Sequence, residues 1–204
     1  MNREELGASL NLKIELIPEG RPNRHGAPII PSKITVHNTS NTSSGADADA
    51  HSNFVRYKGY YELNGRKNWV SWHYTVDDRQ VVKQLPINEK AIHSNRTANA
   101  TSIAIEICMH REIDQDVADD RAARLVAILC YDLRLKTSDV VTHKFWTGKN
   151  CPQLLLAKWD SFITKVQTYL DSISSTETSD DSVLRILSFD LSKVELTDTM
   201  CWED

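Results

Sequence analysis

The sequence predicts an α/β or α+β fold in which helices cover one β-sheet. Three apolar runs bounded by turn-forming or polar residues predict strands at 69–76, 80–85 and 102–108. Two longer stretches, 116–135 and the one that follows Pro152, repeat apolar residues at spacings of three and four, which predicts amphipathic helices. At 204 residues, the chain fits one such domain with a substantial core.

The N-terminal residues 1–32 are expected to be a lead-in packed on the domain that follows. A short apolar element at 12–17 is followed by prolines at 18, 22, 28 and 31, which predicts an extended segment crossing the surface. The N-terminus has no basic region followed by a long apolar core, and no run approaches about 18 apolar residues. We therefore expect synthesis in the cytoplasm without a signal peptide, and no stable membrane insertion.

Charge and cysteine usage narrow the function classes. The net charge is −4, and no stretch is as densely basic as a nucleic-acid binder usually requires, which argues against nucleic acid as a partner. The four cysteines are scattered without close spacing, which is untypical of a disulfide framework. Reduced thiols leave Cys151 free to bind a metal.

A short strand is predicted at 33–37, followed by a polar loop and a helix at 46–55. Alternation places Ile34 and Val36 on one face of this strand and His37 on the other. His37 is therefore expected to point away from the packed side, into a site.

The strand at 102–108 has a similar asymmetry. Its isoleucines share one face, so Glu106 and Cys108 lie on the other face, and Glu106 is a lone carboxylate in an apolar strand. Because an unpaired buried carboxylate is costly, such a residue is either hydrogen-bonded or placed in a cleft where it performs chemistry.

The stretch 141–152 (VTHKFWTGKNCP) places an imidazole, an ammonium and a thiol close together. A loop at Gly148 is expected to bring His143 and Cys151 to one point. Pro152 suits the first turn of the following helix, which predicts that Cys151 lies at a helix N-terminus, where the dipole favours the thiolate. Imidazole and thiolate are zinc ligands, and a catalytic zinc keeps three protein ligands and one open position.

His37 is the best candidate for the third ligand. Beside a zinc-bound water, Glu106 is expected to act as general base and Lys149 to hold the developing oxyanion. A cysteine protease with Cys151 as nucleophile and His143 as base is the alternative, but it gives no role to His37 and Glu106 together.

Five ordered motifs carry a resemblance to a known family. They lie at 34–48, 71–78, 91–94, 99–108 and 143–152, and the match runs from about residue 14 to residue 170. The sequence resembles the zinc-dependent N-acetylmuramoyl-L-alanine amidases of the type-2 group, close to phage endolysins and autolysins. The resemblance implies a central mixed β-sheet flanked by helices, similar to peptidoglycan-recognition proteins.

The resemblance also implies residue roles. The implied zinc ligands are His37, His143 and Cys151. Glu106 falls on the catalytic carboxylate and Lys149 on the lysine that stabilises the transition state. The implied reaction is hydrolysis of the amide between N-acetylmuramic acid and L-alanine of peptidoglycan. Substrate-lining positions are expected at Asn38, Trp72, Tyr74 and His93.

The other histidines have structural or solvent roles in this interpretation. His73 lies in a predicted strand and is interpreted as structural, whereas His25, His51 and His110 are expected to be solvated. Two alternative functions stay open: a muropeptide-binding module without turnover, and a recycling amidase that acts on soluble muropeptides in the cytoplasm.

The chain is thus divided into the lead-in (1–32), a zinc amidase catalytic domain (33–171) and a tail (172–204). The tail has a polar, acidic linker and a short amphipathic segment that is a candidate for docking or for binding a protein partner. Cys201 has no assigned role. A wall-lytic enzyme without a signal peptide is expected to reach the periplasm or the exterior by release or delivery.

Overall fold

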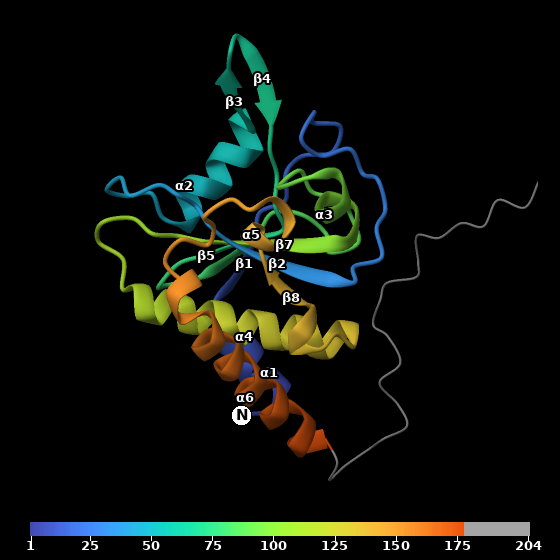
Figure 1. The fold of residues 1–204 in the computed structure, drawn as a ribbon, viewed down its shortest axis with the longest axis vertical. Coiled ribbons are helices and arrows are strands. Elements are labelled where there is room, and N and C mark those ends of the chain that lie inside the picture. The colour runs from blue at the N-terminus through green and yellow to red at the C-terminus, as the bar shows by residue number, and fades with distance from the viewer. Residues whose placement is uncertain (178–204) are drawn as a thin grey trace, which may run out of the picture.

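A computed structural model describes residues 1–177 and confirms the layered α/β fold (Figure 1). A six-stranded sheet has the order β1-β6-β5-β7-β2-β8. Its strands are β1 (Leu12–Ile14), β2 (Lys33–Asn38), β5 (Tyr74–Val76), β6 (Val81–Lys83), β7 (Ser102–Ile107) and β8 (Val140–Thr142). The β5–β6 pair is antiparallel and the other neighbouring pairs are parallel, so the sheet is mixed.

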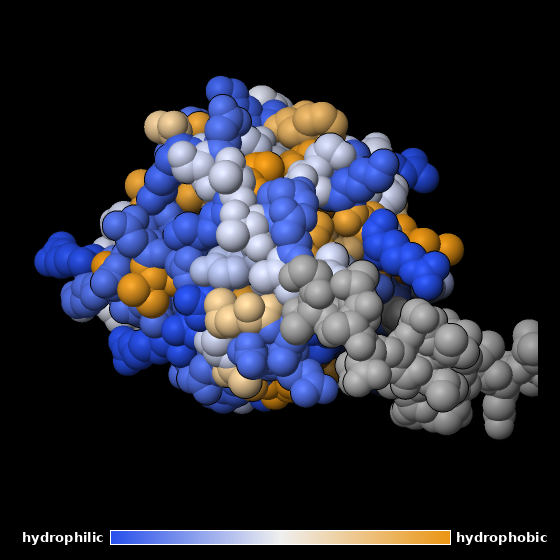
Figure 2. Space-filling view, turned by 90° about the horizontal axis from the view of Figure 1, so that it is seen from below, coloured by the Kyte–Doolittle hydropathy of each residue, from blue (hydrophilic) through white to orange (hydrophobic). Residues whose placement is uncertain are grey.

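Three helices cover one face of the sheet, and shorter elements lie on the other side (Figure 1). The covering helices are α1 (Arg3–Ser9), α4 (Gln115–Leu133) and α6 (Trp159–Glu177). The shorter elements are α2 (Ala48–Asn53), the π-helix η1 (Phe54–Lys58), α3 (Arg96–Thr101) and α5 (His143–Thr147). The 3₁₀ turns η2 (Thr137–Asp139) and η3 (Leu156–Lys158) contact α6 instead. Seen from below, hydrophobic residues are scattered among hydrophilic ones on the surface (Figure 2).

The largest hydrophobic core lies between the sheet and α4, α1 and α6. Ile103, Ile105 and Ile107 are fully buried there, as the alternation in β7 predicts. Helix α4 begins where the Asp114 side chain accepts a hydrogen bond from the backbone N–H of Val117, and it closely matches the predicted range 116–135. The apolar spacing therefore identified the packed face of this helix.

The predicted strand at 69–76 is wrong as a single element. Residues 66–69 form β4 (Arg66–Trp69), which pairs with β3 (Tyr60–Leu63) in a hairpin separate from the main sheet, and β5 begins only at Tyr74. Between them, Ser71 donates to the Ile92 carbonyl and His73 to the Ala104 carbonyl. Because these contacts turn the chain away from the hairpin, the apolar run at 69–76 is divided between two sheets.

The helix predicted directly after Pro152 begins later, at Trp159. The Pro152 carbonyl accepts hydrogen bonds from the N–H groups of Leu155 and Leu156, which closes a separate turn before η3. The side chain of Asn38 accepts a further bond from Leu154 N–H, so the end of β2 holds this segment. Cys151 is therefore not at a helix N-terminus, and a helix dipole does not favour its thiolate.

The N-terminal residues contribute to the fold. Leu6 and Leu10 are buried in the main core, and β1 pairs with β6 at the edge of the sheet. At the other end, α6 continues to Glu177, past the predicted start of the linker at 172. The predicted amphipathic segment and Cys201 lie outside the described residues.

Candidate active site

Three buried side chains converge at one edge of the sheet. His37 lies near the end of β2, His143 is the first residue of α5 directly after β8, and Cys151 follows the α5 turn. Since β2 and β8 are parallel neighbours, their carboxyl ends meet at the same edge. One donor atom from each side chain lies within 4.8 Å of the other two.

The loop between His143 and Cys151 folds back as the sequence predicts. Helix α5 ends at Gly148, which has the left-handed φ of 75°. The Lys144 N–H then donates to the Cys151 carbonyl at 2.9 Å. As a result, Cys151 Sγ lies 3.8 Å from His37 Nδ1.

Glu106 stands beside this group because it is the register partner of His37 in the parallel β2–β7 pair. Its Oε1 lies 3.8 Å from His37 Nδ1. Its Oε2 is buried without a hydrogen-bond partner among residues 1–177. Burial raises the pKa of the Glu106 carboxyl to about 8, although the positive charge of Lys149 acts in the opposite direction.

The three converging residues fit a metal ion. Two imidazoles and one thiol are the donor set that zinc prefers, and burial lowers the pKa of His143 to about 4, so its imidazole is neutral. His143 Nδ1 is buried and has no partner in the described part of the chain. Burial raises the pKa of the Cys151 thiol to about 11. A cation at this point would supply the missing partner and favour the thiolate.

His93 is hydrogen-bonded to the ring nitrogen of His37 that faces away from Cys151. His37 Nε2 and His93 Nδ1 are 3.0 Å apart, and His93 Nε2 lies 3.3 Å from Ser102 Oγ. Since Ser102 donates its proton to the Ala98 carbonyl at 2.8 Å, its oxygen accepts from His93. His93 then accepts at Nδ1, so His37 carries its proton on Nε2 and keeps the Nδ1 lone pair free. A contact of His93 with substrate remains a prediction.

The chain of hydrogen bonds continues to α5. Thr35 Oγ1 donates to Ser102 Oγ at 2.8 Å and accepts from Trp146 Nε1 at 2.9 Å. Sequence reasoning missed these three residues. One signal was available, because Thr35 alternates onto the same face of β2 as His37.

Lys149 is exposed on the loop between α5 and Cys151. Its positive charge contributes to lowering the pKa of His37 and of His143, after the larger effect of burial, and it opposes the raised pKa of Glu106. The ammonium therefore acts on the converging groups while it remains accessible to a ligand.

The remaining predicted positions have different surroundings. Tyr74 lies in the main core, on the face of the sheet that α4 covers, so the structure places it away from the converging residues. It pairs with Ile105, whereas Thr75 pairs with Glu106, and alternation therefore directs Tyr74 to the core face. Asn38 is buried and bonds backbone groups of Ile107 and Leu154, so its amide supports the site loop.

Trp72 lines a groove beside the site. The groove has a volume of about 310 Å³. Its lining residues are Thr39, Asn41, Ala50, His51, Phe54 and Trp72. Thr39 follows directly after β2 and lies two residues after His37, so the groove lies at the same end of this strand as the converging residues.

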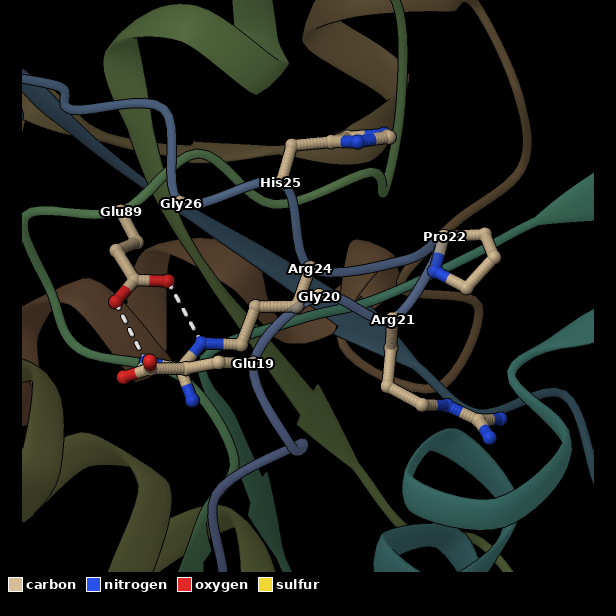
Figure 3. A pocket seen from close by; sticks show the side chains of 8 residues that line it. All are labelled: Glu19, Gly20, Arg21, Pro22, Arg24, His25, Gly26 and Glu89. Carbon is tan, nitrogen blue, oxygen red and sulfur yellow. Dashed lines mark hydrogen bonds and ion pairs between the residues drawn. The ribbon is translucent and has the colours of Figure 1, made fainter.

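A larger pocket, of about 580 Å³, contains none of the converging residues (Figure 3). It is lined by the segment 19–26 and by Glu89. The guanidinium of Arg24 makes two hydrogen bonds to the Glu89 carboxylate, at 2.7 and 2.8 Å. This ion pair between buried Arg24 and half-buried Glu89 holds the N-terminal segment against the segment that follows β6.

Two of the three histidines expected to be solvated are buried. His51 is packed in α2 and His110 follows β7 at the edge of the core, so the expectation is wrong for both, whereas His25 is exposed. His73 is structural, as interpreted: it is fully buried, accepts from Ala104 N–H at Nδ1, and lies 2.8 Å from the Glu89 carbonyl at Nε2. Histidine burial is set by neighbouring segments, which a local sequence pattern does not specify.

Comparison with known proteins defines the class. The family model described as N-acetylmuramoyl-L-alanine amidase matches residues 26–154, and the chain belongs to this family. It is 40% identical to the amidase XlyA and 39% identical to the amidase CwlH, both of Bacillus subtilis strain 168. Each alignment covers 83% of this chain, but 57% of XlyA and 63% of CwlH. The chain thus spans about three fifths of the length of these relatives.

Solved structures agree with this assignment. The catalytic domain of XlyA is 39% identical, with a TM-score of 0.69 over 76% of this chain and 99% of that domain. The structure of PlyL is 28% identical, with a TM-score of 0.64 over 77% of this chain and 96% of the other. Within residues 1–177, no helix combines the length and the apolar character needed to cross a membrane.

Proposed function

We propose that this protein is a zinc-dependent N-acetylmuramoyl-L-alanine amidase that hydrolyses the amide between N-acetylmuramic acid and L-alanine of peptidoglycan stem peptides. The observation that carries the proposal is the convergence of His37, His143 and Cys151 beside the buried carboxyl of Glu106. Membership of the amidase family supports the same reaction.

The proposed ligands are Nδ1 of His37, His143 and Sγ of Cys151. When bound there, a zinc ion would supply a Lewis acid for the scissile carbonyl and would lower the pKa of the attacking water. Glu106 accepts a proton from that water and returns it to the leaving amine of L-alanine. The ammonium of Lys149 stabilises the negative charge that develops on the carbonyl oxygen.

A cysteine protease is less compatible with this geometry. That mechanism requires a thiolate paired with an imidazolium. Burial instead raises the pKa of Cys151 to about 11 and lowers that of His143 to about 4, which favours the neutral pair when no cation is bound. A binding module without turnover has no need for a buried carboxyl with an unpartnered oxygen, so Glu106 favours catalysis.

Mass spectrometry of the products tests the function. The purified protein is incubated with intact peptidoglycan and with soluble muropeptides, with and without a chelator. We expect stem peptides with new L-alanine amino termini, released only when metal is present. Release from soluble muropeptides alone would favour the recycling amidase. No release from either substrate by the zinc-loaded protein would favour the binding module.

A further inference from the structure

The β3–β4 hairpin projects from the body of the molecule and takes no part in the main sheet (Figure 1). Its strands are joined by Asn64 and Gly65, whose φ angles of 52° and 72° are those of a tight two-residue hairpin turn. Tyr60 and Trp69 face each other at the base, with ring centroids 5.0 Å apart. The hairpin is therefore a well-defined structural element that stands apart from the main sheet.

The hairpin is strongly basic. The segment 56–67 contains two arginines, two lysines and a single carboxylate, Glu62. Arg56 forms an ion pair with Glu15 at 3.2 Å. Lys58, Arg66 and Lys67 have no ion-pair partner within the described residues. Three cations thus remain available for an anionic ligand.

Exposed rings and apolar side chains accompany these cations. Tyr57 is 68% exposed, Tyr61 51% and Leu63 57%. Lys58 and Lys67 lie over the Tyr60 ring, with Nζ atoms 5.5 and 4.4 Å from its centroid. A surface that combines cations with exposed aromatic rings suits a polymer that carries both carboxylates and sugar rings.

The base of the hairpin lies next to the groove that Thr39 and Trp72 line. Phe54 begins η1 before the hairpin and Trp72 follows it, and their rings stack with centroids 6.5 Å apart. Both residues line the groove that also includes Thr39, two residues after His37. A long ligand that occupies the groove therefore reaches the base of the hairpin.

We propose that the β3–β4 hairpin is an accessory binding surface for the peptidoglycan polymer beyond the bond that is cleaved. Lys58, Arg66 and Lys67 pair with carboxylates of neighbouring stem peptides, while the faces of Tyr57 and Tyr61 pack on sugars of the glycan strand. This inference rests on the proposed amidase function. Each exposed ion pair is weak, but several on one polymer add up to a useful gain in affinity.

The test compares two triple variants. The hairpin variant carries Lys58→Gln, Arg66→Gln and Lys67→Gln. Its control removes three cations from the opposite face of the molecule: Arg134→Gln and Lys136→Gln, which have no ion-pair partner within the described residues, and Lys165→Gln, whose partner is Asp120. Equal unfolding temperatures are checked first. Binding to insoluble peptidoglycan, stripped of phosphodiester polymers with hydrofluoric acid, is measured by co-sedimentation in a Glu106→Gln background that leaves the polymer intact.

We expect the hairpin variant to bind insoluble peptidoglycan roughly tenfold more weakly than the control, with the difference fading at high salt. With Glu106 restored, its hydrolysis of the insoluble polymer falls similarly, while kcat/KM on a soluble muramyl dipeptide is unchanged. A second variant, Tyr61→Ser, is expected to weaken binding in a salt-independent way.

Equal binding by the hairpin variant and the control would overturn the proposal. So would an equal loss on the soluble dipeptide, because the hairpin would then act at the scissile bond. Binding confined to walls that retain their phosphodiester polymers would assign the hairpin to that polymer instead. Co-sedimentation measures binding and requires no turnover, so it tests the hairpin independently of the amidase function. If the proposed amidase function is wrong, the unmodified protein will hydrolyse neither substrate.

Discussion

Two buried pairs of a histidine and a cysteine have the same spacing in this molecule but different chemistry. Cys151 Sγ lies 3.8 Å from His37 Nδ1, and Cys108 Sγ lies 3.8 Å from His51 Nδ1. His51 Nδ1 is 2.8 Å from a backbone carbonyl, that of Asp47, so this nitrogen carries the proton and donates it. His37 bonds through its other nitrogen, and its Nδ1 is left for a cation.

A third donor separates the two pairs further. His143 joins the first pair, whereas His110 lies near the second. In both histidines, Nδ1 is buried without a partner in the described part of the chain. Among residues 1–177, only the group with His143 has three donor atoms within 4.8 Å of one another. Residue types alone therefore do not make a metal site, because the free lone pairs must also converge.

The largest effect is expected from exchanging the two cysteines for serine. Cys151→Ser should weaken zinc binding by at least about 100-fold and should abolish hydrolysis. This loss is larger than the one usual for residues that only hydrogen-bond to a metal ligand. Cys108→Ser should keep both zinc and turnover. Metal content by mass spectrometry and competition with a zinc chelator measure the difference. Equal zinc binding by the two variants would show that Cys151 is not a zinc ligand that Cys108 cannot replace.

Glu106→Gln should lower kcat by about 10²–10⁴-fold, because the amide cannot accept the proton of water. Zinc content should remain at the level of the unmodified protein, since Glu106 is not one of the proposed ligands. Turnover of a soluble muropeptide and metal analysis are measured on the same preparation. Full activity in this variant would contradict the proposed role of the carboxyl.

The hydrogen bond between His93 and His37 predicts a smaller effect on metal binding. His93→Ala should weaken zinc binding by roughly 10–100-fold, because His37 loses the partner that fixes its tautomer. His93→Asn should recover part of the loss, since Oδ1 of asparagine replaces Nδ1 as acceptor. His51→Ala, the matched change in the other pair, should leave zinc affinity unchanged. Chelator competition distinguishes these outcomes, and equal losses in His93→Ala and His51→Ala would contradict the tautomer argument.

The smallest expected effect is on the stability of the metal-free protein. The pKa of Glu106 is raised from 4.5 to about 8, so the folded state holds its proton more tightly than the unfolded state does. The stabilising effect is complete below about pH 4.5 and is lost as the pH rises to about 8. The Tm of the unmodified protein minus that of Glu106→Gln should therefore fall by about 5–10 °C between pH 5 and 8.

This difference isolates Glu106, because the buried histidines are common to both proteins and destabilise them alike at low pH. Adding zinc should flatten the pH dependence, since a cation beside the carboxyl favours its charged form. Thermal unfolding followed by circular dichroism provides the measurement. A difference in Tm that does not change with pH in the metal-free proteins would show that the carboxyl is not shifted.

The sequence by itself determined the features that depend on local periodicity. Alternation in β2 and β7 placed His37 and Glu106 on the face opposite the main core, and the helical spacing identified the packed face of α4. The turn at Gly148 allowed His143 and Cys151 to be paired in advance. Strand and helix periods are properties of the backbone, so they can be read from a single segment.

The tertiary structure alone decided what depends on which segments become neighbours. It directed Tyr74 to the core and buried His51 and His110. It also moved the start of α6 from Pro152 to Trp159 and separated the hairpin from the main sheet. It also placed His93 against His37, although 56 residues separate them in the chain. A short apolar run or a single histidine fits several environments equally well, and long-range hydrogen bonds and packing select one of them.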